Sequence, residues 1–193
     1  MARRRRLVPV AEDIVEQLAD IARRSGLTIP ELAETILGQA VRVLRGRDDV
    51  AGVLADAVIL ADIARLGGSP VPLRGLGLLL DNVGEEEARR FIEEATGLAR
   101  LVAVSARARG VDQVTGVVSV LRSLFPGAAV DLVEDDRSAR VVLASPLFVG
   151  RLLRLAEASA SAVVEGFGAE LLGRETEPGL VVVKYKPRRR RVL

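Results

Sequence analysis

Two amphipathic helices joined by one tight turn constrain the fold of this chain more than any other feature of its sequence. Residues 12–24 read EDIVEQLADIARR, with acids first and apolar residues at helical spacing, which predicts a helix with one buried face. Gly26 then stops the helix. The second helix starts at TIPEL, where Thr28 and Glu31 form a capping-box pattern. Its apolar stripe, which we expect to be buried, is Leu32, Ile36, Ala40, Val43 and Leu44.

A short apolar stretch before the first helix adds a further constraint. Leu7–Val10 is too short and too rich in β-branched residues for a helix, so we predict a strand. A lone strand has no partner within residues 1–45, and two short helices cannot bury their stripes alone. The sequence therefore predicts a homodimer, or a higher even oligomer, built around this unit.

The segment VAEDIVEQLADIARRSGLTIPEL resembles the ribbon–helix–helix family of DNA-binding proteins, the Arc and MetJ type. The resemblance covers about residues 1–45. It implies that two chains pair their strands into a ribbon that enters the major groove of DNA. It also implies a set of DNA contacts, and in this sequence those positions are Arg3, Arg4, Arg5, Arg6, Leu7, Thr28 and Ile29.

The individual DNA contacts follow from strand alternation and from helix ends. If Val8 and Val10 face the helices, the residues that face the DNA are Arg3, Arg5, Leu7 and Pro9. Arg5 can then fork onto a guanine. The start of the second helix offers backbone N–H groups to a phosphate. Leu7 and Pro9 depart from the family, which usually holds polar residues there. The alternatives are a solvated arginine tail on a plain helical hairpin, or a unit used only for dimerisation.

Composition narrows the function classes. The chain has no Cys and no His, which excludes thiol and imidazole catalysis and His- or Cys-based metal sites. We predict no catalytic residues, no metal, no cofactor and no enzyme activity. Lysine occurs only twice, which hints at a thermophile or a GC-rich genome. Both termini are arginine-rich although the net charge is only +2, which favours a polyanionic partner. No apolar run reaches bilayer length, so we expect a cytoplasmic protein without a membrane partner.

The rest of the chain predicts a second domain, within a helix-rich α+β fold overall. We expect domains at 1–46 and 50–187, with a basic tail at 188–193. Residues 50–66 form an almost wholly apolar helix, which is buried on most sides or pairs with its symmetry mate. The remaining expectations are an ambiguous segment at 73–84, helices at 85–110 and 112–125, a hairpin at 128–145, a long helix at 146–175 and a closing strand at 179–185.

Residues 163–175, VVEGFGAELLGRE, followed by a strand resemble the end of four-vinyl-reductase-type ligand-binding domains. The resemblance implies a small-molecule effector. We expect Phe91, Phe125, Phe148 and Phe167 to be core residues rather than ligand contacts; if a ligand pocket exists, Phe148 and Phe167 are the candidate contacts. The cysteines common late in that family are absent. An alternative takes residues 98–106, LARLVAVSA, as a strand, which gives the ferredoxin-like order of nickel-responsive regulators; the lack of His and Cys argues against nickel.

These observations predict a homodimeric DNA-binding transcriptional regulator whose second domain senses an effector or oligomerises. The alternative is a structural, nucleoid-type protein that coats nucleic acid without sequence preference through its arginine-rich ends.

Overall fold

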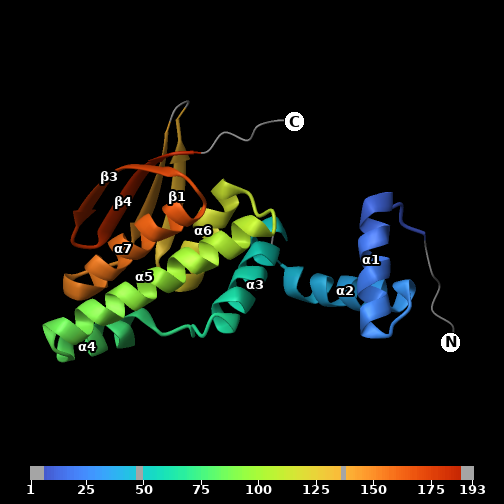
Figure 1. The fold of residues 1–193 in the computed structure, drawn as a ribbon, viewed down its shortest axis with the longest axis horizontal. Helices are drawn as coiled ribbons and strands as arrows, with labels where there is room; N and C mark the ends of the chain where they lie inside the picture. The colour runs from blue at the N-terminus through green and yellow to red at the C-terminus, as the bar shows by residue number, and fades with distance from the viewer. Residues whose placement is uncertain (1–6, 47–49, 136–137, 188–193) are drawn as a thin grey trace. The chain divides into compact units, whose positions relative to one another are not determined.

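The computed structural model describes residues 7–46, 50–135 and 138–187. The chain divides into two compact units, Met1–Val50 and Ala51–Leu193, which we call unit 1 and unit 2. Their elements are drawn in Figure 1. The protein is helix-rich α+β, as predicted.

Unit 1 is a helical hairpin made of α1 (Glu12–Ser25) and α2 (Ile29–Leu44). Gly26 ends α1 with a left-handed backbone (φ 68°), and the Leu27 N–H donates to the Ala22 carbonyl, an arrangement typical of a glycine C-cap. Both ends of the turn therefore agree with the sequence prediction.

The strand predicted at Leu7–Val10 is wrong for the single chain. These residues form neither helix nor strand, and the described part of unit 1 contains helices only. An extended segment becomes a strand only when a neighbouring segment accepts and donates its hydrogen bonds, and unit 1 supplies no such neighbour among its described residues.

Unit 2 combines five helices with one four-stranded antiparallel sheet among its described residues. The helices are α3 (Val50–Arg65), α4 (Leu73–Asn82), α5 (Glu85–Ala108), α6 (Gln113–Leu124) and α7 (Gly150–Gly166). The strands are β1 (Ala129–Glu134), β2 (Ala139–Ala144), β3 (Glu170–Glu177) and β4 (Leu180–Lys186).

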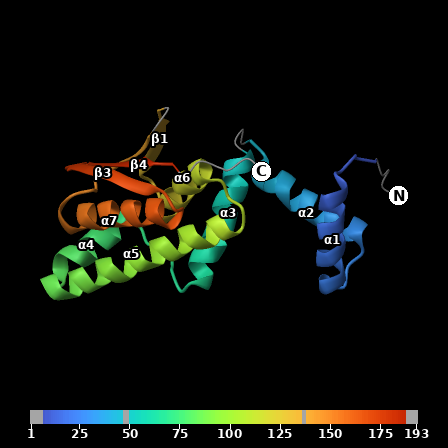
Figure 2. The ribbon, with the colours of Figure 1, turned by 45° about the horizontal axis from the view of Figure 1, so that its top comes forward.

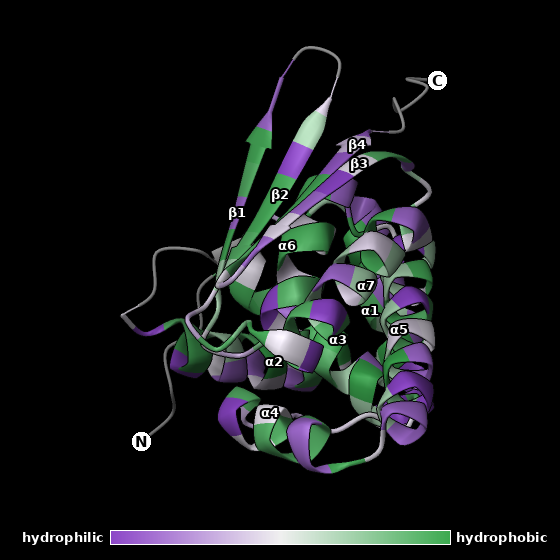
Figure 3. Ribbon diagram, turned by 90° about the vertical axis from the view of Figure 1, so that its left-hand side faces the viewer, coloured by the Kyte–Doolittle hydropathy of each residue, from purple (hydrophilic) through white to green (hydrophobic). Residues whose placement is uncertain are grey.

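The sheet has the order β1-β2-β4-β3, so β4 lies between the predicted hairpin and β3. Helix α7 packs on β3 and β4, α6 packs on β1, and α5 runs along α7 (Figures 1 and 2). Buried and less buried residues alternate along β2 and β4, so one face of the sheet is buried; Figure 3 colours the sheet and the helices by hydropathy. The core joins Val141, Val183 and Tyr185 of the sheet to Phe148 and Leu152 beside it.

Two predictions about unit 2 require correction. The long helix predicted over 146–175 begins at Gly150 and ends at Gly166, and Glu170–Glu177 forms the edge strand β3 instead. Gly168 adopts φ 80°, which interrupts the helix, and β3 pairs with the valine-rich β4. The ferredoxin-like alternative is also wrong, because residues 98–106 lie inside α5. The ambiguous segment 73–84 is mostly helix α4.

Candidate functional sites

The predicted DNA-contacting arginines, Arg3 to Arg6, lie outside the described residues. Leu7 is fully exposed, and Val8 and Val10, which we expected to face the helices, are also exposed. The described start of the chain therefore carries apolar side chains that are not covered within unit 1.

The start of α2, where we predicted a phosphate contact, forms a complete capping box. The Glu31 N–H donates to the Thr28 hydroxyl oxygen at 3.4 Å, and the Thr28 N–H donates to the Glu31 carboxylate at 2.9 Å. The Glu31 carboxylate thus accepts a hydrogen bond from the Thr28 N–H, one of the donors that a phosphate would use. Of the two predicted contacts, this leaves the backbone N–H of Ile29 as the more accessible one.

The helices of unit 1 bury very little of their own apolar surface. Only Ala22 and Leu32 are buried among the described apolar residues of unit 1. The exposed apolar residues on the two helices are Ile14, Val15, Ile21, Ile29, Ile36, Leu37, Val41 and Val43. A helical hairpin with so small a core gains little stability from burial within unit 1.

An apolar pocket of about 460 Å³ opens in unit 2. Its wall combines the segment that follows α3 with parts of α4, α5 and α7 and the end of α6. The main lining residues are Leu66, Gly68, Leu76, Phe91, Leu98, Phe125, Leu155 and Ser159. Ser159 is buried, and its hydroxyl is a polar group on a largely apolar wall. The exposed Glu94 also lines the pocket, so a pocket of this size and lining suits a small, mainly apolar molecule.

Neither Phe148 nor Phe167 lines this pocket. Phe148 is fully buried and makes an edge-to-face contact with Phe125, with ring centroids 5.6 Å apart. Phe167 caps the end of α7 and packs against Gly116 of α6, where a β-carbon would collide with its ring. Phe148 therefore supports the pocket through Phe125, and Phe167 fills the core. Sequence reasoning missed Leu66, Phe91 and Leu98, because their spacing is that of any amphipathic helix.

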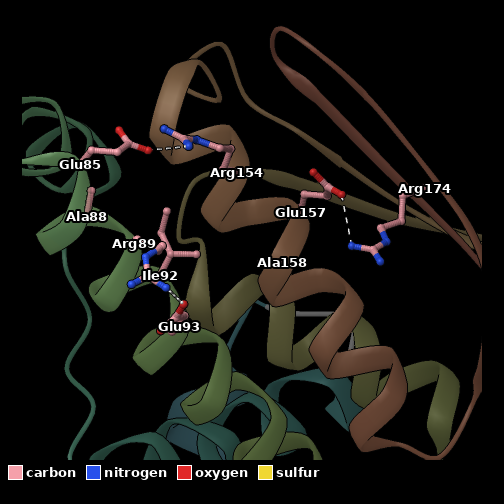
Figure 4. A pocket seen from close by; sticks show the side chains of 9 residues that line it. All are labelled: Glu85, Ala88, Arg89, Ile92, Glu93, Arg154, Glu157, Ala158 and Arg174. Carbon is pink, nitrogen blue, oxygen red and sulfur yellow. Dashed lines mark hydrogen bonds and ion pairs between the residues drawn. The ribbon is translucent and has the colours of Figure 1, made fainter.

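A second concave site, the charged groove, lies between α5, α7 and β3 and has a volume of about 390 Å³ (Figure 4). Arg154 donates to Glu85 at 2.9 Å, and Arg174 faces Glu157 at 3.5 Å. Hydrogen bonds from Arg154 and then Arg151 lower the pKa of Glu85.

Every arginine that lines the charged groove has a carboxylate partner, since Arg89 binds Glu86 and Glu93. A ligand would have to displace these ion pairs. The groove is therefore best explained as a surface network that joins α7 to the start of α5.

Unit 2 contains a buried aspartate whose ion pairs were not predicted from the sequence. Asp62 of α3 is 1% exposed, and it accepts a 2.6 Å hydrogen bond from Arg109 and a 3.3 Å one from Arg65. Arg65 also donates to Ser105 of α5. These contacts fasten α3 to the C-terminal half of α5. No sequence signal identifies the pair, because Arg109 is 47 positions from Asp62.

Across residues 7–46, 50–135 and 138–187, no group of three or more acidic, His or Cys side chains is placed to hold a metal ion. None of the described helices is long and apolar enough to cross a membrane. Comparison with models of known protein families and with curated proteins finds no match for this sequence.

Proposed function

We propose that the chain is a homodimeric DNA-binding transcriptional regulator. Unit 1 serves as the dimerisation and DNA-binding part, in a ribbon–helix–helix arrangement completed by a second copy. Unit 2 binds a small apolar effector or contributes to oligomerisation.

The observation that carries this proposal is the incompleteness of unit 1. The two helices, one ended by Gly26 and the other begun by a capping box, expose most of their apolar residues, and the segment from Leu7 to Val10 pairs with no described strand. A second copy would supply both missing elements, since two such segments can pair antiparallel and two helix pairs can share one core. Ile36 and Leu37 are 44% and 60% exposed, so covering what remains of their surface contributes on the order of 1 kcal/mol each.

DNA is the favoured partner because the arginine run directly precedes the segment that would form the ribbon. Arginine binds phosphates and forks onto guanine, and a two-stranded ribbon fits the major groove. Sequence-independent coating of nucleic acid through the two arginine-rich ends is the alternative, favoured by the second basic cluster at Arg188–Arg191.

Selection of binding sites from fragmented genomic DNA tests the proposal. A regulator should choose a palindromic site over random DNA by roughly 10³ or more. Equal binding to every duplex would favour the coating protein. A stable monomer at micromolar concentration in sedimentation analysis would rule out the dimer and the DNA-reading ribbon with it.

Replacing Arg3 and Arg5 with Ala sharpens the test. We expect duplex binding to fall sharply while the dimer and its melting temperature stay unchanged. If these arginines bind phosphates, the slope of log affinity against log salt should become shallower by about 0.9 for each phosphate that the variant no longer neutralises. The matched control replaces Arg189 and Arg190 with Ala. Complete loss of binding in this control, with none in the ribbon variant, would show that the opening arginines are a tail.

The apolar pocket is the proposed effector site, and its test uses the neutral apolar dye Nile red. The dye should bind the native protein, and Leu98→Trp, which fills the pocket, should abolish binding. Leu101→Trp is the matched control, because Leu101 is 55% exposed on the same helix and lies outside the pocket wall. If both variants bind the dye equally, the apolar pocket is not the effector site.

A further inference from the structure

The apolar pocket of unit 2 has a single charged group in the part of its wall that the structure describes. This group is Glu94 of α5, which is exposed and therefore lies at the pocket entrance. No ion pair or hydrogen bond joins its carboxylate to another described residue. By contrast, Glu86 and Glu93 on the same helix are paired with arginine. Arg90, four residues before Glu94, donates to Glu86 instead. Glu94 is thus an unpaired carboxylate at the edge of an apolar wall.

An exposed aromatic ring lies next to this carboxylate. Phe91 is 44% exposed and lines the same pocket. Phe91 and Glu94 are three positions apart on α5, a spacing that places two side chains side by side on one helix face. The face of an aromatic ring attracts cations, and a carboxylate pairs with them. A carboxylate beside an exposed ring therefore favours a ligand that carries a positive charge and disfavours an anionic one.

The inner wall of the pocket adds a polar group without a partner. Ser159 of α7 is 3% exposed and lines the pocket, and no hydrogen bond joins its hydroxyl to another described residue. A buried hydroxyl without a partner costs stability, which a bound molecule with a polar atom recovers. The rest of the described wall is mainly apolar and includes Leu76, Leu98 and Leu155. The pocket thus combines an apolar interior with a negative charge at its entrance.

We propose that the apolar pocket binds a small apolar amine. The protonated amine lies at the Glu94 carboxylate and the ring of Phe91, and the apolar body of the ligand fills the interior. This inference rests on the proposed effector role of the pocket and names the chemical class of the effector. The carboxylates that line the charged groove are paired with arginines, so they do not compete for the amine.

Three probes that share one rigid apolar body test the inference by isothermal titration calorimetry of the full chain. The probes are adamantanamine, adamantanol and adamantanecarboxylate, which are cationic, neutral and anionic at neutral pH. An exposed ion pair and a cation on an aromatic ring each contribute modestly, so we expect the amine to bind roughly tenfold more tightly than the alcohol. The carboxylate should bind most weakly. Leu98→Trp, which fills the pocket, should abolish binding of the amine.

The variant Glu94→Gln removes the charge and keeps the size of the side chain. In this variant the amine should bind no more tightly than the alcohol, and the affinity for the alcohol should stay unchanged. Glu87→Gln is the matched control, because Glu87 is exposed on the same helix but lies outside the pocket wall. It removes the same charge from the protein and should keep the preference for the amine. A preference that survives in Glu94→Gln would contradict the inference.

Two further variants locate the ammonium group within the pocket. Phe91→Leu keeps an apolar side chain but removes the aromatic face, so the preference for the amine should fall roughly two- to fivefold. Ser159→Ala should keep the preference, because the ammonium group lies at the entrance rather than at the inner wall. If Ser159→Ala loses the preference while Glu94→Gln keeps it, the inference is wrong.

Nile red separates this inference from the proposed effector role. If Nile red binds in the pocket but the three probes bind equally or not at all, the amine class is wrong and the pocket remains the effector site. If neither Nile red nor any of the probes binds the native protein, the effector site and the inference both fail.

Discussion

Unit 1 and unit 2 differ in how completely each buries its own apolar residues. Unit 2 has a continuous core that runs from Ile59 to Tyr185 and joins its helices to the sheet. Unit 1 buries only Ala22 and Leu32 among its described apolar residues, although Gly26 ends α1 and a capping box begins α2. The local sequence signals of unit 1 thus suffice to specify its two helices, but they do not produce a hydrophobic core.

The aromatic residues make this comparison measurable. The chain has four Phe, one Tyr and no Trp, and all of them lie in unit 2 between Phe91 and Tyr185. Near-ultraviolet circular dichroism therefore reports on unit 2 alone, whereas the far-ultraviolet signal reports on both units. The two signals together distinguish a change in one unit from a change in the other.

The largest effect is expected from Phe148→Ala. Phe148 is fully buried against Phe125, so its removal leaves a cavity and should destabilise unit 2 by about 3–5 kcal/mol. The near-ultraviolet transition in urea should shift strongly, and the helical signal of unit 1 should persist. Phe91→Ala, at a 44% exposed site, is the control and should cost much less. Simultaneous loss of both signals would show that unit 1 depends on unit 2.

The next effect concerns the buried acid of α3. Arg109→Ala leaves Asp62 buried with only the longer contact to Arg65, and we expect a loss of roughly 3 kcal/mol in the unfolding of unit 2. Arg65→Ala should cost less, because the 2.6 Å contact to Arg109 remains. The double variant Asp62→Ala/Arg109→Ala should lose less than the sum of its single variants, since it removes the unpaired charge. Strict additivity would contradict a direct coupling.

Because of Tyr185, we expect unit 2 to lose stability at alkaline pH. Burial, with a smaller contribution from Glu134, raises the pKa of Tyr185 from 10 to about 12. Because the folded pKa is raised, its contribution to stability is fully present below pH 10 and is lost as pH rises towards 12, by roughly 2–3 kcal/mol. As the only tyrosine, its absorbance change reports this titration directly. A midpoint near 10 with unit 2 still folded would show that the phenol is accessible.

The smallest effect is expected at the capping box of unit 1. Thr28→Ala removes the hydroxyl that accepts from the Glu31 N–H and should destabilise α2 by about 1 kcal/mol. The far-ultraviolet signal should melt earlier while the near-ultraviolet transition stays fixed. Thr35→Ala is the control, because Thr35 lies inside α2 and its hydroxyl donates to the Glu31 carbonyl of the same helix. An equal loss in both variants would assign the effect to helix propensity rather than capping.

The sequence predicted those elements whose signals are local. The helices at 12–25 and 29–44 followed from apolar spacing, from Gly26 and from the Thr28–Glu31 pair. The hairpin of β1 and β2 and the closing strand β4 followed from runs of β-branched residues. In these segments the decisive interactions join residues a few positions apart, so composition and periodicity contain them.

The predictions from the sequence were wrong where the hydrogen-bonding partner of a segment is distant in the chain or absent. Residues 170–175, ELLGRE, have helical composition, yet pairing with β4 makes them part of a strand. Leu7–Val10 has strand composition, yet no described segment of unit 1 pairs with it. In both cases long-range hydrogen bonding, or its absence, outweighed local propensity.

The sequence alone determined the helix boundaries of unit 1 and the positions of the β1–β2 hairpin and of the strand β4. Only the tertiary structure decided that α3 is held to α5 by Asp62 and Arg109, and that the apolar pocket is lined from separate helices. The physical reason is that periodicity specifies which face of an element is apolar, whereas the choice of what covers that face depends on the three-dimensional packing of residues far apart in the chain.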